Sequence, residues 1–202
     1  MPLWLSPDPL VLASRSAVRR EILQAAGIAV EIVPADIDER AVERQAGTDE
    51  PAVAARLLAR EKARAVAAAH PGRIVLGADQ TLSLGNRRLS KPADRAGARA
   101  QLLELRARTH ELHSAAALVR DGTLHAELHD VAALTMRNFS DAFLEAYLDA
   151  AGASVTQSVG GYQLEKTGIQ LFARIEGSHF TILGLPLFAL LQSLRDLRLV
   201  SA

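Results

Sequence analysis

Short apolar runs alternate along this chain with segments of helical spacing, and only short polar breaks separate them. A run such as residues 10–13 is typical of a buried strand, whereas residues 16–26 place apolar side chains on one helical face that ends at Gly27. Repeated alternation of this kind favours an α/β fold. The predicted strands span residues 10–13, 29–33, 73–77, 81–84, 110–119 and 124–136, and the predicted helices span residues 16–26, 51–69, 93–105, 141–150 and 186–197.

Two glycine-containing turns predict hairpins between these strands. Asp121 and Gly122 separate the two longest strand-like runs, which is the strongest hairpin signal in the chain. Gly85 and Asn86 indicate a second hairpin, and we expect it to bring Lys91 back beside Asp79. No flexible linker interrupts the chain, so we expect residues 1–202 to form a single domain whose two packed lobes share a cleft.

Charged and polar side chains stand where several of the apolar runs end. Because the runs are buried, residues just beyond their ends are expected at a rim and not in a core. Ser14 and Arg19 flank a strand-to-helix turn, where backbone N–H groups and an arginine fork favour a phosphate. A rim that mixes carboxylates with cations suits a phosphate ester and its metal. The set comprises Ser14, Arg19, Asp36, Asp38, Glu39, Lys62, Asp79 and Lys91.

The composition excludes several other classes of protein. The 23 basic and 23 acidic residues cancel, so no overall field attracts nucleic acid or an anionic membrane. The absence of cysteine excludes disulfides, thiolate zinc and a cysteine nucleophile. No apolar stretch approaches the roughly 20 residues that span a bilayer. We therefore expect a cytoplasmic protein that contacts neither nucleic acid nor membrane.

Six strings, spread in order along nearly the whole chain, resemble the motifs of one protein family. They are LVLASRSAVRREIL, DIDE, LAREKARAVA, GADQTL, LSKP and GIQLFARIEGSHFTILGLPL. Together they resemble the Maf family of nucleoside triphosphate pyrophosphatases. The resemblance implies a two-lobed Maf/ITPase-like α/β fold, with a central mixed β-sheet flanked by helices and a cleft between the lobes. It also implies a homodimer that hydrolyses a nucleoside triphosphate to the monophosphate and pyrophosphate with Mg²⁺ or Mn²⁺.

The resemblance assigns roles to the residues of these motifs. Asp79 matches the catalytic aspartate and is expected to accept a proton and to bind the metal, which Glu39 also binds. A carboxylate, cations and a metal are what hydrolysis between the α- and β-phosphates requires. The residues expected to bind the substrate phosphates are Ser14, Arg19, Lys62 and Lys91.

Three positions are expected to select the base. Gln80 and Glu165 resemble the subgroup that hydrolyses 7-methyl-GTP, and a carboxylate can accept the hydrogen bonds that guanine donates. Val18 departs from that subgroup, which has a tryptophan there that could stack on a cationic purine. Ala17 likewise replaces the usual proline of this turn. The resemblance thus favours a modified purine nucleotide. The changes at Val18 and Ala17 leave the phosphate-binding residues in place and could broaden the range of bases that the site accepts.

Two functional classes follow from the sequence. One is an enzyme that removes modified nucleotides before they enter nucleic acid. The other is a regulatory nucleotide-binding protein of cell division, a role associated with the same family. The presence of Asp79, Lys62 and Lys91 favours the enzyme, because a sensor needs tight binding but no carboxylate that activates water.

Overall fold

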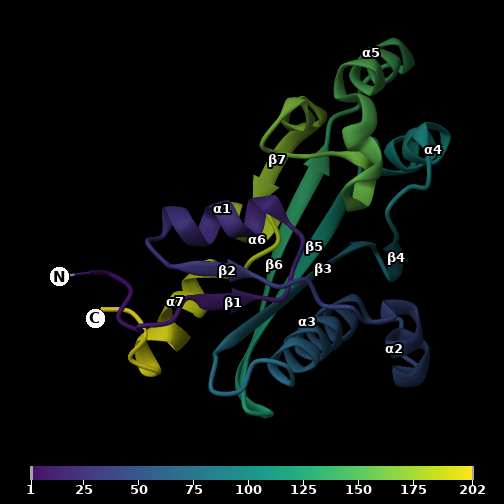
Figure 1. Ribbon diagram of the computed structural model, residues 1–202. Helices are drawn as coiled ribbons and strands as arrows, with labels where there is room; N and C mark the ends of the chain where they lie inside the picture. Colours follow the sequence, from purple (N-terminus) through teal and green to yellow (C-terminus); the bar gives the residue numbers. More distant parts are fainter. Residues whose placement is uncertain (1, 202) are drawn as a thin grey trace.

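The computed structural model describes residues 2–201 and is built on one mixed, seven-stranded sheet (Figure 1). The strands are β1 (Leu10–Leu12), β2 (Val30–Ile32), β3 (Val75–Leu84), β4 (Arg87–Leu89), β5 (Thr109–Arg120), β6 (Thr123–Met136) and β7 (Phe172–Glu176). The α-helices are α1 (Ala17–Ala25), α2 (Glu39–Ala46), α3 (Pro51–Ala67), α4 (Arg95–Leu105), α5 (Asp141–Ala151), α6 (His179–Ile182) and α7 (Leu187–Asp196). Three 3₁₀ turns follow α5: η1 (Gly152–Thr156), η2 (Val159–Gly161) and η3 (Thr167–Leu171).

The sheet combines parallel and antiparallel pairs. Its order is β2-β1-β3-β5-β6-β7, with β4 paired to β3 off this path. β1 runs parallel to both β2 and β3, whereas β3, β5, β6 and β7 pair antiparallel in succession. The prediction of an α/β fold with a central mixed sheet flanked by helices is therefore confirmed.

The long strands β3, β5 and β6 run through two lobes (Figure 1). In the first lobe, α3 packs on one face of the sheet through its own small side chains, such as Ala59 and Ala63, while α1 and α7 cover the other face with leucines. In the second lobe, α4, α5 and the 3₁₀ turns enclose a separate core that includes Leu102, Leu144 and Tyr162. Each lobe thus buries its own apolar side chains, and the shared strands hold the two together.

Both predicted hairpins are confirmed, but one expectation about the sheet is wrong. Asp121 and Gly122 join β5 to β6, and Gly85 and Asn86 join β3 to β4. The expected break around Asp79 does not exist, because β3 continues from Val75 to Leu84. Asp79 lies inside the strand and is 9% exposed, not at a rim. A buried carboxylate is tolerated there because a lysine side chain from α3 pairs with it.

Two short helices (α2 and α6), one short strand (β7) and the three 3₁₀ turns were not expected from the sequence. The acidic segment continues into α2, with Asp38 as the N-cap that accepts a hydrogen bond from Ala41 N. β7 and α6 form between the predicted helices 141–150 and 186–197, where no strand or helix is predicted. Their short lengths leave too few residues for a periodic signal.

Gly77 brings α3 against the sheet. A Cβ atom at this position would lie 2.0 Å from the carbonyl oxygen of Ala59 and 2.9 Å from the Cβ of Ala63. The helix backbone can therefore contact β3 directly only when residue 77 has no side chain. This contact lies two residues before Asp79 and one turn from Lys62, so it sets the distance between strand and helix at the site.

Replacing Gly77 with alanine is expected to lower the free energy of unfolding by about 1–3 kcal/mol, because the added methyl group overpacks a contact with backbone atoms. Urea denaturation measures the change. Gly97→Ala is a matched control, since its Cβ would meet no atom closer than 3.4 Å and alanine favours the helix. Equal midpoints for Gly77→Ala and the wild type would contradict this account of the helix–sheet contact.

Candidate active site

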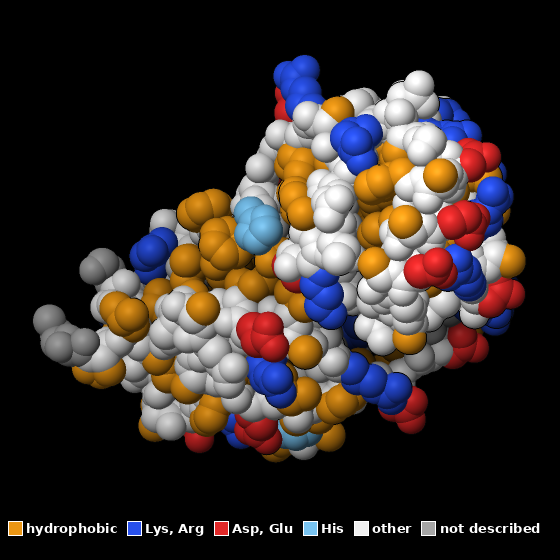
Figure 2. Space-filling view, turned by 90° about the horizontal axis from the view of Figure 1, so that it is seen from above, with side chains coloured by type: hydrophobic (Ala, Val, Ile, Leu, Met, Phe, Trp, Pro, Cys, Tyr) orange, Lys and Arg blue, Asp and Glu red, His pale blue; other side chains and the backbone are white. Residues whose placement is uncertain are grey.

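One large cavity is lined by every residue that the sequence singled out for the site. Its volume is about 1290 Å³, and it lies between the two lobes. Figure 2 shows the surface hollowed where the lobes meet. The predicted residues around this cavity are Ser14, Val18, Arg19, Glu39, Lys62, Asp79, Gln80, Lys91 and Glu165.

The cavity opens where β3 lacks a neighbouring strand on one side. β1 pairs with β3 up to Leu76, and β4 begins to pair with it at Leu82. Among residues 2–201, no strand pairs with residues 77–81 on that side. Asp79 stands in the middle of this stretch, so a strand in the core of the sheet still presents a side chain to the cavity.

A lysine bridges two carboxylates at the centre of the site. Lys62 Nζ on α3 lies 2.6 Å from Asp79 Oδ1 and 2.7 Å from Glu39 Oε1 on α2. The side chains of Lys62 and Asp79 are each only 12% exposed, whereas that of Glu39 is 52% exposed. Three elements thus converge on one ammonium group, and water has limited access to the inner pair.

Burial and neighbouring charges act in opposite directions on the pKa of Asp79. Burial raises the pKa of the Asp79 carboxyl above its usual value, although Lys62 and Arg19 act in the opposite direction. A carboxylate with a raised pKa is a stronger base than an exposed one. The position therefore suits a group that accepts a proton from water.

Arg19 is tied to the protein by three hydrogen bonds. Its Nε donates to the carbonyl oxygen of Gly184 at 2.8 Å, and its Nη1 donates to Ala78 O at 3.0 Å and to Ser14 Oγ at 3.3 Å. Burial lowers the pKa of the Arg19 guanidinium, with Asp79 and Glu39 opposing that shift. The side chain joins α1 to the open stretch of β3, and Nη2 is the part that remains for a phosphate.

The N-terminal end of α1 also faces the cavity. Ser16 caps the helix by accepting a hydrogen bond from Arg19 N at 3.3 Å. Ser14 Oγ accepts one from Ser16 N at 3.2 Å. Arg15 and Ala17 line the cavity beside them. A capped helix start next to two arginines is a suitable place for an anion.

Gln80 is held by a buried polar network that the sequence did not indicate. Its Nε2 lies 3.0 Å from Ser114 Oγ, 3.0 Å from Thr181 O and 2.9 Å from Ile182 O. Thr181 in turn donates to Asp130 Oδ2. The amide nitrogen is therefore committed to β5 and α6, and Oε1 is the atom left for a ligand. The network joins residues far apart in sequence, so only the fold reveals it.

The other predicted residues lie at the edges of the cavity. Lys91 is exposed just beyond β4, and no hydrogen bond or ion pair links it to Asp79 among the residues described. The expectation that these two side chains meet is wrong, because β3 and β4 pair only from Leu82 onward. Glu165 is exposed between η2 and η3 in the second lobe. Local sequence also gave no role to Arg88, which lines the cavity and pairs with Glu43 at 2.8 Å.

The donor set at the centre fits a hard divalent cation. Asp79 and Glu39 supply carboxylate oxygens, which Mg²⁺ and Mn²⁺ prefer. No group of three or more His, Cys, Asp or Glu side chains in residues 2–201 has the geometry to hold a metal by itself. Mg²⁺ commonly takes only one or two carboxylates and completes its coordination with water and substrate phosphates, so the two carboxylates are compatible with that mode.

Sequence comparison identifies the class of protein that carries this site. The family model described as Maf-like protein matches residues 9–197. The chain therefore belongs to the Maf-like protein family. A protein of Rhodopseudomonas palustris (strain BisB18) named nucleoside triphosphate pyrophosphatase is 57% identical over 202 residues, covering 100% of both chains. A protein of the same name from Bradyrhizobium diazoefficiens is 54% identical over 201 residues, again covering 100% of both.

One solved structure shows a weaker likeness. A HAM1 protein from Coxiella burnetii is 18% identical and matches with a TM-score of 0.43, covering 64% of this chain and 73% of its own. That score is too low to establish a shared fold.

None of the helices within residues 2–201 has the length and apolar character needed to cross a membrane.

Proposed function

We propose that this protein hydrolyses a nucleoside triphosphate between its α- and β-phosphates, releasing the monophosphate and pyrophosphate. The observation that carries the proposal is the buried Asp79 carboxylate, which faces the cavity from the open stretch of β3 with Lys62 bonded to it at 2.6 Å. The full-length relatives named nucleoside triphosphate pyrophosphatase support the same reaction.

Each part of the site has a task in this reaction. Asp79 orients a water molecule and accepts its proton as the water attacks the α-phosphorus. Lys62 and Lys91, with Arg19 Nη2 and Ser14 at the start of α1, bind phosphate oxygens and offset the charge that develops on the leaving pyrophosphate. The pyrophosphate leaves as an anion, and the proton from water remains on Asp79 until solvent removes it.

A divalent cation belongs to this proposal. Asp79 and Glu39 would hold Mg²⁺ or Mn²⁺ together with oxygens of the substrate. When bound, the cation offsets negative charge on the phosphates. Lys62 contacts both carboxylates. When no metal is bound, its positive charge offsets their mutual repulsion and keeps them close to each other.

The preferred base is proposed to be a purine, with 7-methyl-GTP as the leading candidate. Glu165 lines the cavity and is exposed, so its carboxylate is free to accept hydrogen bonds from the guanine edge. Gln80 contributes through Oε1 alone, because its nitrogen is bonded to protein. Val18 lines the cavity with an aliphatic side chain and offers no stacking surface.

The wider role is proposed to be the removal of modified nucleotides in the cytoplasm. In this proposal residues 1–202 form a single domain, and two such chains form a homodimer. The alternative is a regulatory protein of cell division that binds nucleotide without turning it over. The buried pairing of Lys62 with Asp79 favours the enzyme, because a binding protein gains nothing from a carboxylate placed next to substrate phosphates.

A substrate panel tests the proposal. Purified protein is incubated with 7-methyl-GTP, GTP, UTP, dTTP and CTP in the presence of Mg²⁺, Mn²⁺ or a chelator, and pyrophosphate release is followed. We expect release that requires the metal and is fastest with 7-methyl-GTP. Faster release from the pyrimidines would remove the base assignment. Binding of these nucleotides without any release would favour the regulatory protein.

A further inference from the structure

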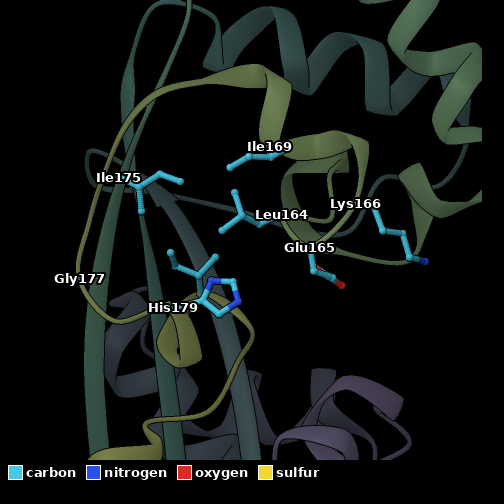
Figure 3. Close-up of a pocket in the computed structure, with 8 residues that line it drawn as sticks. Leu164, Glu165, Lys166, Ile169, Ile175, Gly177 and His179 are labelled. Carbon is cyan, nitrogen blue, oxygen red and sulfur yellow. The ribbon is translucent and has the colours of Figure 1, made fainter.

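A second, apolar pocket lies beside the main cavity. Its volume is about 390 Å³. Leu164, Ile169, Ile175 and Ile182 supply its apolar walls, and Figure 3 shows the first three converging on one space. Leu164, Glu165, Lys166 and Ile182 line both spaces, so the pocket adjoins the main cavity.

The two adjoining spaces differ in chemical character. The main cavity is lined by many charged side chains, whereas most of the pocket wall is aliphatic. Ile169 remains 50% exposed within that wall. A ligand that fills both spaces would need an anionic part for the main cavity and a compact group with apolar faces for the pocket. A nucleotide has this combination, because the faces of its base are apolar while its phosphates are charged.

A histidine ring stands at the side of the pocket. His179, the first residue of α6, lines it, and Figure 3 shows the ring below Leu164, on the side where Glu165 lies. The ring is packed edge-on against Phe180, with 6.3 Å between centroids. Among the residues described, His179 is the only aromatic side chain around the pocket, and Tyr162 is the only one around the main cavity.

Neighbouring contacts fix both walls of the pocket. Gly177 packs against β6 so closely that a Cβ there would lie 2.9 Å from Ala132 Cα, which sets the start of α6. On the other side, Tyr162 is 4% exposed and its hydroxyl lies 2.6 Å from His110 Nε2. Because Tyr162 is held in this way, it anchors the segment that carries Leu164 and presents no free ring for stacking.

We propose that this pocket receives the nucleobase and that the ring of His179 stacks on one of its faces, opposite the aliphatic wall. The inference rests on the proposed function, because it assumes that the phosphates occupy the main cavity. Glu165 lies at the junction of the two spaces, where it can contact the edge of a base placed this way. His179 thereby supplies the flat contact surface that Val18 does not provide.

The test is calorimetric binding of two probes to the full-length protein. α,β-Methylene-GTP cannot be hydrolysed between the α- and β-phosphates, and inorganic tripolyphosphate has no base. Stacking of a base on an aromatic ring contributes enough that its loss weakens binding about fivefold or more. We therefore expect His179→Ala to raise the Kd of α,β-methylene-GTP at least about fivefold, and to leave the Kd of tripolyphosphate within about twofold of the wild type.

Two further variants sharpen the test. His179→Phe keeps a flat ring and is expected to retain the wild-type Kd within about twofold. His125→Ala removes an exposed histidine at the far end of β6 and is expected to change neither Kd. An unchanged Kd for α,β-methylene-GTP in His179→Ala would overturn the inference, and so would an equal loss of tripolyphosphate binding.

The inference and the proposed function can fail separately. Wild-type turnover without the expected change in His179→Ala would overturn the inference and leave the reaction in place. The expected binding pattern without wild-type turnover would support the base pocket and overturn the proposed reaction.

Discussion

Replacing Asp79 with asparagine is expected to lower kcat for pyrophosphate release about 100- to 10,000-fold, the range typical of losing a general base. Asparagine has nearly the same size, and its oxygen can still accept the hydrogen bond from Lys62 Nζ. It cannot accept a proton from water at neutral pH. The fold should therefore be retained while turnover is lost, and steady-state kinetics with calorimetric nucleotide binding measures both.

The matched control for this variant is Asp49→Asn. Asp49 is exposed between α2 and α3 and does not line the cavity, so its replacement is expected to leave kcat within about twofold. Retention of more than about a tenth of the wild-type kcat by Asp79→Asn would remove Asp79 from its assigned role.

Replacing Lys62 with methionine is expected to lower kcat/KM about 100-fold or more, because a preorganised cation at the reacting phosphates is lost. It also removes the largest influence that opposes the raised pKa of Asp79, so that pKa rises further. A base works only when it is deprotonated, so activity declines when the pH falls below the pKa of Asp79. The acidic limb of the pH profile of kcat/KM should therefore move to higher pH.

Arg64→Met serves as the control for Lys62→Met. Arg64 lies on the same helix, and its exposed side chain pairs with Glu61 at 3.1 Å. Exposed pairs of this kind contribute little, so the pH profile should stay in place. An acidic limb in Lys62→Met that coincides with that of the wild type would contradict the assigned influence of Lys62 on Asp79.

Local patterns were sufficient to predict much of the fold. The N-cap serine of α5, Ser140, accepts a hydrogen bond from Phe143 N at the start of a helix that the sequence predicts, and both hairpin turns lie where glycine indicated them. These features depend on a few adjacent residues, so their signals survive in any context. The motif strings were equally informative about the site, since the residues taken from them surround one cavity.

The position of Asp79 could not be predicted from local pattern. A charge inside an apolar run ordinarily marks the end of a strand, but here Lys62 from a distant helix makes the burial of Asp79 possible. Gly77 permits that helix to approach, and the glycine is explained only by the backbone of Ala59 opposite it. Both facts depend on contacts between segments that lie apart in sequence.

The network around Gln80 and the pocket beside His179 have the same origin. Gln80 on β3 contacts Thr181 on α6, about a hundred residues later in the chain. The pocket joins β7, α6 and the segment that follows η2. No sequence period links these elements, so they became visible only in the structure.

Product analysis tests the central claim most directly. A nucleoside triphosphate is incubated with the wild-type protein and a divalent cation, and the nucleotide and phosphate products are separated and quantified over time. The site described above predicts nucleoside monophosphate and pyrophosphate in equal amounts, with no diphosphate intermediate. Nucleoside diphosphate with inorganic phosphate would contradict attack at the α-phosphorus and with it the proposed arrangement of the substrate around Asp79.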